Sequence, residues 1–181
     1  MIVEEKTISS DKIYTGKVVS LRLDTVEIPG KGYQKREIVE HGGAVGIVAL
    51  TEDKKLILVK QFRKPIEKVI WELPAGKLEI GENPKECAIR ELKEETGYSA
   101  ENIKLIHKFF TSAGFSNEKL YIYLATGLIK GDTHFDEDEF LDIFEVDFNE
   151  AYDLVLNNEV EDAKTSIGIL LAKELIEKEL V

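Results

Sequence analysis

The chain has 181 residues, 43% of them hydrophobic and 33% charged, which is typical of a globular protein and not of a disordered one. Its formal net charge of -11 argues against general nucleic-acid binding, because such binding relies on a basic surface. The single cysteine excludes a disulfide framework, the first ten residues lack the basic and apolar regions of a secretory signal, and no apolar run is long enough to span a bilayer. We therefore expect a cytoplasmic protein with neither a nucleic-acid nor a membrane partner.

Two β-hairpins are predicted in the first third of the chain. Alternating residues indicate strands at 13–28 and 33–40, joined by the turn-forming residues 29–32. The β-branched apolar runs 44–50 and 56–62 are separated by a polar segment and indicate a second hairpin within a buried sheet.

The remaining pattern combines a helix near residue 90 with further strands and two terminal helices. The order of strands, one helix, more strands and helices at the end indicates an α+β fold. The later strands are expected at 103–110, 119–126 and 141–146, and the terminal helices at about 149–157 and 163–179.

The helix near residue 90 can be located from its own start and stop signals. Asn83 is a suitable N-cap, Pro84 suits the first helical position, and Gly97 is a natural end. About 13 residues are therefore predicted to be helical.

This helix gathers acidic residues on one side. At about 100° per residue, Glu91, Glu94 and Glu95 share an arc with the small residues Cys87 and Ala88, so this arc is expected to face protein. A solvated arc is expected to hold Glu86, Arg90 and Lys93, with Arg90 able to pair with Glu94, and the packing flank to hold Ile89 and Leu92.

Carboxylates this close repel one another, and a hard divalent ion such as Mg2+ would offset that repulsion. The plainer interpretation is a solvated Glu/Lys helix held together by ion pairs. A resemblance of the whole segment to a known signature favours the metal.

The segment resembles the signature of the Nudix hydrolases. The match comprises Gly76, Glu82, Arg90, Glu91, Leu92, Glu94, Glu95 and Gly97, closed by the large residue Tyr98. The flanking sequences resemble the ADP-ribose pyrophosphatase branch of that family: REIVEHGGAV at 36–45, QFR at 61–63, WELPAGK before the signature, TSAGFSNE at 111–118 and DEDE at 136–139.

The resemblance implies a fold, a domain organisation and a reaction. The expected fold is a Nudix-type α/β/α sandwich with a mixed sheet, in which residues 1–41 form an antiparallel β subdomain that pairs with a second subunit in a homodimer, and residues 42–181 form the hydrolase domain. The expected reaction is Mg2+-dependent cleavage of ADP-ribose to AMP and ribose 5-phosphate, with Mn2+ as an alternative metal.

The resemblance also implies a set of metal ligands. Glu91 and Glu95 would bind metal directly, Glu94 would be a ligand or a supporting partner, and the carbonyl of Ala75 would complete the set. Glu82 and Arg90 would support the loop and the helix.

The acidic run at 136–139 has two interpretations. An acidic tetrapeptide is usually a solvated loop. The resemblance favours a functional loop in which Glu137 or Glu139 acts as general base or as a further metal ligand, with Glu139 preferred as the ligand and Glu137 as the base.

Substrate contacts are expected outside the signature. Arg63 ends an apolar strand and is either a surface charge or a phosphate clamp, and the clamp is preferred. Arg36 and Glu118 are substrate-binding candidates mainly through the resemblance. An aromatic residue should stack on adenine, and Tyr14 and Trp71 are candidates, although packing is the preferred role of both.

One departure bears on substrate choice. The branch usually has Ser-Pro-Gly in the loop where this chain has Ser112, Ala113 and Gly114. Alanine allows the geometry that proline enforces. Hydrolysis of another nucleoside diphosphate sugar therefore remains an alternative. A nucleotide-sensing module without turnover is a separate alternative from a different functional class.

Overall fold

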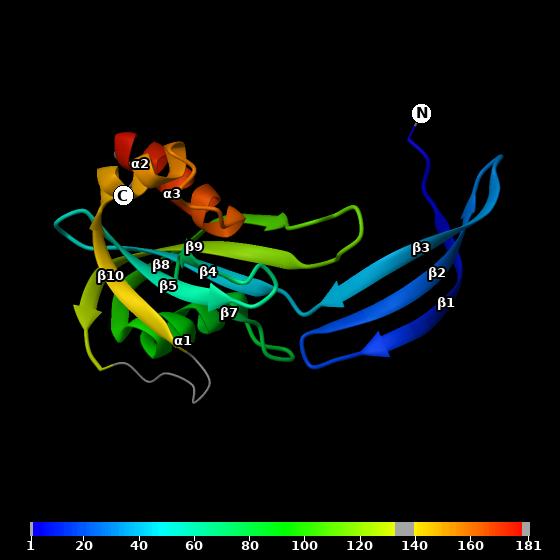
Figure 1. Cartoon of the computed structure of the whole chain (residues 1–181), viewed down its shortest axis with the longest axis horizontal. Coiled ribbons are helices and arrows are strands. Elements are labelled where there is room, and N and C mark those ends of the chain that lie inside the picture. Colours follow the sequence, from blue (N-terminus) through cyan, green and yellow to red (C-terminus); the bar gives the residue numbers. More distant parts are fainter. Residues whose placement is uncertain (1, 133–139, 179–181) are drawn as a thin grey trace. The chain divides into compact units, whose positions relative to one another are not determined.

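A computed structural model describes residues 2–132 and 140–178 and divides the chain into two compact units. The first unit contains Met1–Gly43 together with Phe109–Lys119, and the second contains Ala44–Lys108 together with Leu120–Val181. Figure 1 shows the arrangement of strands and helices within each unit.

The first unit is built on a three-stranded antiparallel sheet. Its strands are β1 (Lys6–Thr15), β2 (Val19–Ile28) and β3 (Gly32–His41), in the order β1-β2-β3. The prediction of one strand over residues 13–28 was wrong, because the Gly16 amide donates to the Val19 carbonyl in a turn that separates β1 from β2. Every residue of β1 is exposed, and its sequence KTISSDKIYT has no regular apolar alternation that would mark it as a strand.

The second unit is built on a seven-stranded mixed sheet. Its main strand order is β10-β5-β4-β9-β8, with β6 paired to β5 and β7 paired to β4. The β4–β9 pair is parallel, whereas β5 runs antiparallel to β4, β6 and β10. The bounds are β4 (Ala44–Leu50), β5 (Lys55–Arg63), β6 (Lys68–Glu72), β7 (Ala75–Lys77), β8 (Tyr98–Phe110), β9 (Lys119–Lys130) and β10 (Leu141–Asp147).

Helices cover both faces of this mixed sheet. One face packs against α1 (Pro84–Thr96), and the shared core contains Val45 and Ile47 from β4 with Ala88 and Leu92 from α1. The other face packs against α3 (Ala163–Glu177), where Gly168 allows close approach to Val48 of β4; α2 (Phe148–Leu156) precedes α3 (Figure 1). Because successive residues of β4 point to opposite faces, this arrangement is the predicted α/β/α sandwich.

The signature helix has the predicted bounds and caps. The Asn83 side chain accepts a hydrogen bond from the Lys85 amide, Pro84 is the first helical residue, and Gly97 adopts φ 74° at the C-terminal end. The left-handed conformation explains why a glycine ends the helix. The prediction for Ile89 was wrong, since its side chain is exposed and only Leu92 of the predicted flank is in the core.

No helix among the described residues is long and apolar enough to cross a membrane.

Candidate active site

The signature carboxylates meet the short strand β7, directly before the loop that leads into α1. A Cβ atom placed on Gly76 would lie 1.8 Å from the Glu91 carboxyl carbon and from its Oε1, so only glycine leaves room for this carboxylate. The Ala75 amide donates a hydrogen bond of 3.0 Å to Glu95 Oε2. The carboxylates of Glu91 and Glu95, one turn apart on α1, therefore converge on two consecutive residues of β7.

The three glutamates of the predicted arc differ in their exposure to solvent. Glu91 is 8% exposed and Glu95 3% exposed, whereas the Glu94 side chain is 39% exposed. Glu91 and Glu95 thus face protein as predicted, and Glu94 lies at the edge of that arc.

Arg90 links three carboxylates of the signature segment. Its Nη1 donates to Glu91 Oε1 at 2.8 Å and to Glu94 Oε2 at 2.9 Å. Its Nε and Nη2 donate to the two carboxylate oxygens of Glu82 at 3.0 and 3.1 Å. The pairing with Glu94 was predicted, but Arg90 is half-buried and does not lie in a purely solvated arc.

The same arginine lowers the pKa of Glu82. The hydrogen bonds from Arg90, together with the one that the Glu79 amide donates, bring the pKa of the Glu82 carboxyl to about 2. Glu82 therefore remains ionised at any physiological pH and holds the loop before α1 to the middle of the helix.

Cys87 is part of the core. Burial, followed by the hydrogen bond to Glu82 and the negative charge of Glu82, raises the pKa of its thiol to about 12. The thiol is therefore protonated at neutral pH, which fits packing and not nucleophilic chemistry.

The donor chemistry of this cluster suits a hard divalent cation. Glu91, Glu94 and Glu95 offer only oxygen ligands, and the convergence of Glu91 and Glu95 on β7 brings them to the Ala75–Gly76 segment. Within residues 2–132 and 140–178, no three His, Cys, Asp or Glu side chains form a ready cluster for a metal ion. Arg90 instead provides positive charge beside Glu91 and Glu94.

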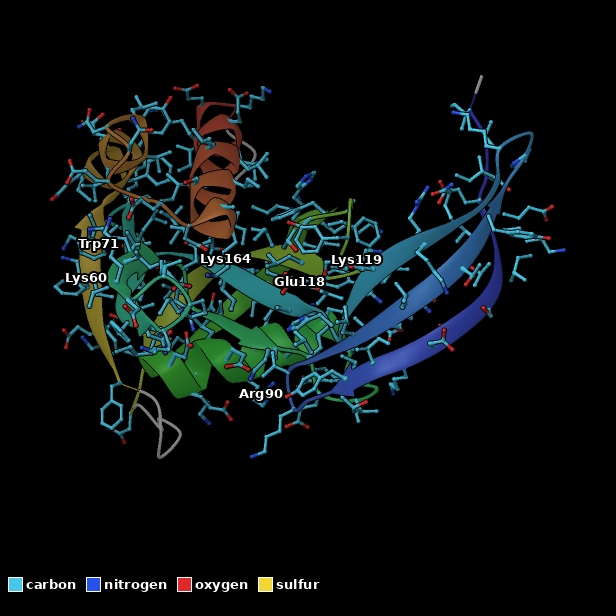
Figure 2. The ribbon with its side chains drawn as sticks, turned by 45° about the vertical axis from the view of Figure 1, so that its right-hand side comes forward. Lys60, Trp71, Arg90, Glu118, Lys119 and Lys164 are labelled. Atoms are coloured by element: carbon cyan, nitrogen blue, oxygen red, sulfur yellow. The ribbon has the colours of Figure 1, made fainter. Side chains whose placement is uncertain are left out.

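Arg63 is the predicted phosphate clamp that lies in the second unit. Its Nε and Nη2 form a fork with Glu72, at 2.5 Å to Oε1 and 2.9 Å to Oε2. Glu72 also accepts a hydrogen bond from Lys164, which lies near the start of α3 (Figure 2). Sequence reasoning had not singled out Glu72 or Lys164, and the 92 residues that separate them left no local signal.

The other predicted substrate residues lie in the first unit. Arg36 forms a fork with Glu5, at 2.9 and 2.5 Å, and both side chains are more than a third exposed. Glu118 accepts a hydrogen bond of 2.6 Å from the Thr111 hydroxyl and lies 3.3 Å from His41 Nδ1.

Ala113 and Gly114 form the middle of a tight turn in the first unit. The amides of Phe115 and Ser116 both donate to the Ser112 carbonyl, at 3.0 and 2.9 Å. The same loop is fixed to β3, because the Val39 amide donates to the Phe115 carbonyl.

The aromatic candidates have different surroundings. Tyr14 is exposed on β1. Trp71 stacks edge-on against Phe144 at 4.9 Å between ring centroids, and Lys60 Nζ lies 4.1 Å from the Trp71 centroid (Figure 2). Trp71 is therefore engaged in packing, its preferred role. The predicted Glu137 and Glu139 lie outside the described residues.

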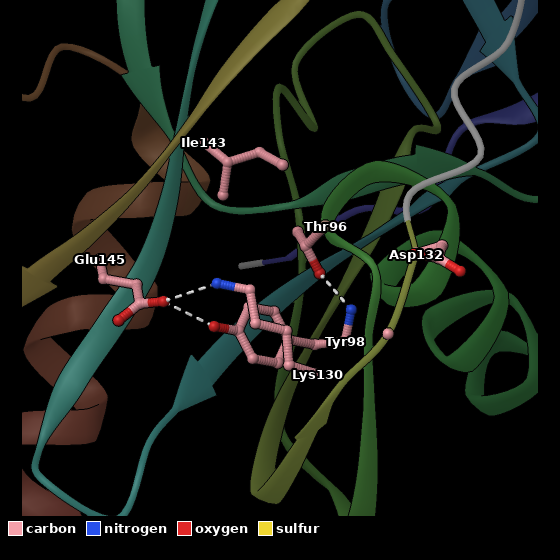
Figure 3. Close-up of a pocket in the computed structure, with 7 residues that line it drawn as sticks. Thr96, Tyr98, Lys130, Asp132, Ile143 and Glu145 are labelled. Carbon is pink, nitrogen blue, oxygen red and sulfur yellow. Dashed lines mark hydrogen bonds and ion pairs between the residues drawn. The ribbon is translucent and has the colours of Figure 1, made fainter.

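A pocket of about 310 Å³ lies at the C-terminal end of the signature segment (Figure 3). The Tyr98 hydroxyl donates to Glu145 Oε1 at 2.7 Å, and Lys130 Nζ lies 3.4 Å from the same oxygen. None of the predicted site residues lines this pocket, whose wall is formed by Thr96, Tyr98, Lys130, Gly131, Asp132, Ile143 and Glu145.

Comparison with known proteins identifies the family of this chain. A family model described as the NUDIX domain matches residues 40–167. The chain belongs to the Nudix family. This confirms the resemblance carried by the segment from Gly76 to Tyr98.

Several proteins with named functions are similar in sequence to this Nudix protein. It is 48% identical over 169 residues to the ADP-ribose pyrophosphatase of Bacillus subtilis (strain 168), covering 92% of this chain and 91% of the relative. It is 46% identical over 170 residues to the methanol dehydrogenase activator of Bacillus methanolicus, covering 93% and 92%. It is 45% identical over 124 residues to the ADP-ribose pyrophosphatase of Mycobacterium tuberculosis (strain ATCC 25618 / H37Rv), covering 68% and 60%.

A solved structure confirms the Nudix fold. The crystal structure of an ADP compounds hydrolase superimposes with a TM-score of 0.86 and covers 97% of this chain and 96% of that one. Its sequence identity is 22%, so the match concerns the fold.

Proposed function

We propose that this Nudix protein hydrolyses the pyrophosphate bond of ADP-ribose, giving AMP and ribose 5-phosphate. The observation that carries the proposal is the 48% identity, over 92% of the chain, to a relative named ADP-ribose pyrophosphatase. The complete signature supports it, because the chain lacks none of the carboxylates that the reaction requires.

We propose Mg2+ as the metal, with Mn2+ as an alternative. Glu91, Glu95 and the Ala75 carbonyl would hold it, with Glu94 and Glu139 as further ligands. The convergence of Glu91 and Glu95 on β7 supports this assignment. A bound divalent ion would supply charge neutralisation for the pyrophosphate and a more acidic water molecule.

The chain's own residues would bind the substrate and move the proton. Glu137 or Glu139, or Glu94 at the exposed edge of the cluster, would accept the proton of the attacking water. Arg36 and Arg63 would bind phosphate oxygens, since guanidinium groups suit such binding and the protein as a whole carries a charge of -11. Glu118 and the turn at Ala113 and Gly114 would contact the remainder of the substrate.

We also propose a homodimer in the cytoplasm, with residues 1–41 as the pairing subdomain and residues 42–181 as the hydrolase domain. The described part of the first unit has no helix to cover its sheet. Several of its large apolar side chains are exposed: Ile8, Ile13, Tyr14 and Tyr33. A second copy of the chain would cover such a surface.

Two other functions are open to the same test. Another nucleoside diphosphate sugar would use the same cluster with a different substrate pocket. A module that binds a nucleotide and regulates another protein without turnover is favoured by the 46% identity to a protein named methanol dehydrogenase activator.

The test is a product assay on a panel of nucleoside diphosphate sugars, with Mg2+, with Mn2+ and with a chelator. We expect AMP and ribose 5-phosphate as products, the highest kcat/KM on ADP-ribose, and loss of turnover with the chelator. A faster rate on another sugar nucleotide would overturn the substrate assignment. Tight binding of ADP-ribose without any cleavage would instead favour the sensing function.

A further inference from the structure

We propose that Lys164 is a positioning residue for substrate binding, acting through the buried carboxylate of Glu72 on the guanidinium of Arg63. The inference rests on the proposed function, in which Arg63 binds a phosphate of the substrate. Glu72 and Lys164 both lie outside the signature segment, so this assignment extends the site to α3.

Glu72 is buried and accepts hydrogen bonds from both cations. Glu72 is 1% exposed, at the end of β6. Burial alone raises the pKa of its carboxyl, but the hydrogen bond from Arg63 and the charge of Lys164 outweigh that effect and leave the pKa below its ordinary value. A buried carboxylate with one of its two cations removed would be poorly compensated, and its geometry would change.

Arg63 can hold Glu72 and still bind a ligand. Its fork to Glu72 uses two N–H donors, and a guanidinium has five, so about three remain on the side away from the carboxylate. The Arg63 side chain is 41% exposed, whereas that of Glu72 is 2% exposed. The fork therefore fixes the plane of the guanidinium and leaves its other edge accessible, which suits bidentate recognition of a phosphate.

Lys164 is itself held in place. Its Nζ lies 3.1 Å from Asp162 Oδ2, and its side chain is 12% exposed. Asp162 also caps α3, accepting from the Thr165 amide at 2.9 Å, and the Thr165 hydroxyl accepts from the Leu73 amide at 2.8 Å. The start of α3 is thereby tied to the chain just after Glu72.

A chain of contacts through the sheet links this cluster to the signature carboxylates. The Lys164 side chain passes over Gly46, where an added Cβ atom would be 3.7 Å from Lys164 Cδ. Gly46 pairs with Ala75, the residue whose amide binds Glu95. The hydrogen bond to Glu72 is the main cause that raises the pKa of the Arg63 guanidinium, and the negative charge of Glu95 adds to it. A phosphate held by Arg63 would therefore lie near the carboxylates proposed to bind metal.

The test compares Lys164→Met with Lys164→Arg and with Lys178→Met. Lys178 is an exposed lysine paired with Glu174 at the C-terminal end of α3, so its substitution makes the same change in net charge outside the cluster. For Lys164→Met we expect KM for ADP-ribose to rise about tenfold with kcat within about twofold of wild type, since the lost interaction aids binding. Lys164→Arg should restore most of the affinity, and Lys178→Met should change neither constant.

A double-mutant cycle with Arg63→Ala separates positioning from general stability. If Lys164 acts through Arg63, then Lys164→Met adds little to the rise in KM that Arg63→Ala causes. Independent, multiplicative effects on KM would overturn the proposal, as would a Lys164→Met variant with unchanged KM. If Lys164→Met alone does not fold, the double variant Glu72→Gln/Lys164→Met removes both charges together and should show the same rise.

Failure of the positioning role of Lys164 can be distinguished from failure of the proposed ADP-ribose hydrolysis. If the wild type cleaves nothing, the proposed function fails, and the affinity for ADP-ribose measured by titration calorimetry replaces KM in the same cycle. A wild type that turns over ADP-ribose, with Lys164→Met indistinguishable from it, would refute the positioning role alone.

Discussion

The signature cluster of the second unit and the candidate substrate residues of the first unit are built in opposite ways. Glu91 and Glu95 are buried and fixed by a glycine contact, a backbone amide and an arginine. Arg36 pairs with Glu5 at a site where both side chains are 36–40% exposed. Under the proposed function, chemistry that needs fixed geometry would lie in the packed unit, and Arg36 would rearrange around a ligand in the more exposed one.

The largest effect is expected from Glu95→Gln. The amide keeps the size of the side chain and an oxygen that can accept from the Ala75 amide, so the thermal midpoint should change little. Loss of the charge should lower kcat by about 10³-fold or more, because it removes a proposed metal ligand. A variant that keeps more than a tenth of the wild-type kcat would contradict the role of the cluster.

Gly76→Ala should produce the next largest effect. Its methyl group would overlap the Glu91 carboxylate, which Arg90 holds from the other side. A displaced carboxylate should lower kcat by about 10²-fold. Gly114→Ala is the matched control for stability in the first unit, because an added Cβ there meets nothing within 4 Å. Equal losses of thermal stability in the two variants would contradict the contrast between the units.

Glu82 should contribute a stability that depends on pH. Its pKa is lowered from 4.5 to about 2 in the folded protein, so between these values the unfolded state binds more protons and stability rises with pH. The contribution is fully present above pH 4.5 and is lost as the pH falls toward 2. The difference in thermal midpoint between wild type and Glu82→Gln should therefore become smaller as the pH falls from 4.5 to about 2. A difference that does not depend on pH would exclude the ion pair with Arg90 as its cause.

Ala113→Pro should have the smallest effect. Ala113 follows Ser112 in a turn closed by the Phe115 amide, which is the position that proline favours. We expect a gain of about 0.4–1 kcal/mol in the free energy of unfolding, because proline restricts the unfolded chain. Chemical denaturation can measure this gain. A large loss of stability would show that the turn does not have the conformation described.

Local signals in the sequence were sufficient for the signature helix. Its N-cap, its first-turn proline and its terminal glycine each have a local physical cause, and all three lie where predicted. The same is true of β4 and β5, whose apolar runs are buried in the sheet.

Other elements had no local signal. β1 has no buried face, and β6 and β7 are only five and three residues long, too short for a periodic pattern. Arg90 was expected in solvent, since periodicity cannot reveal that a loop residue such as Glu82 folds back onto it. The pairing of Glu72 with Lys164 depends on packing α3 against β4 and β6, a long-range contact that no short motif encodes.

The central claim is that the signature cluster determines the reaction and the residues outside it determine the substrate. The most direct test is the kcat/KM profile of wild type, Glu95→Gln and Arg36→Ala on ADP-ribose and other nucleoside diphosphate sugars. We predict that Glu95→Gln lowers every rate by a similar factor, and that Arg36→Ala changes the ranking of substrates without loss of thermal stability, because its exposed ion pair contributes little. A changed ranking in Glu95→Gln, together with a uniform loss of rate in Arg36→Ala, would contradict the account.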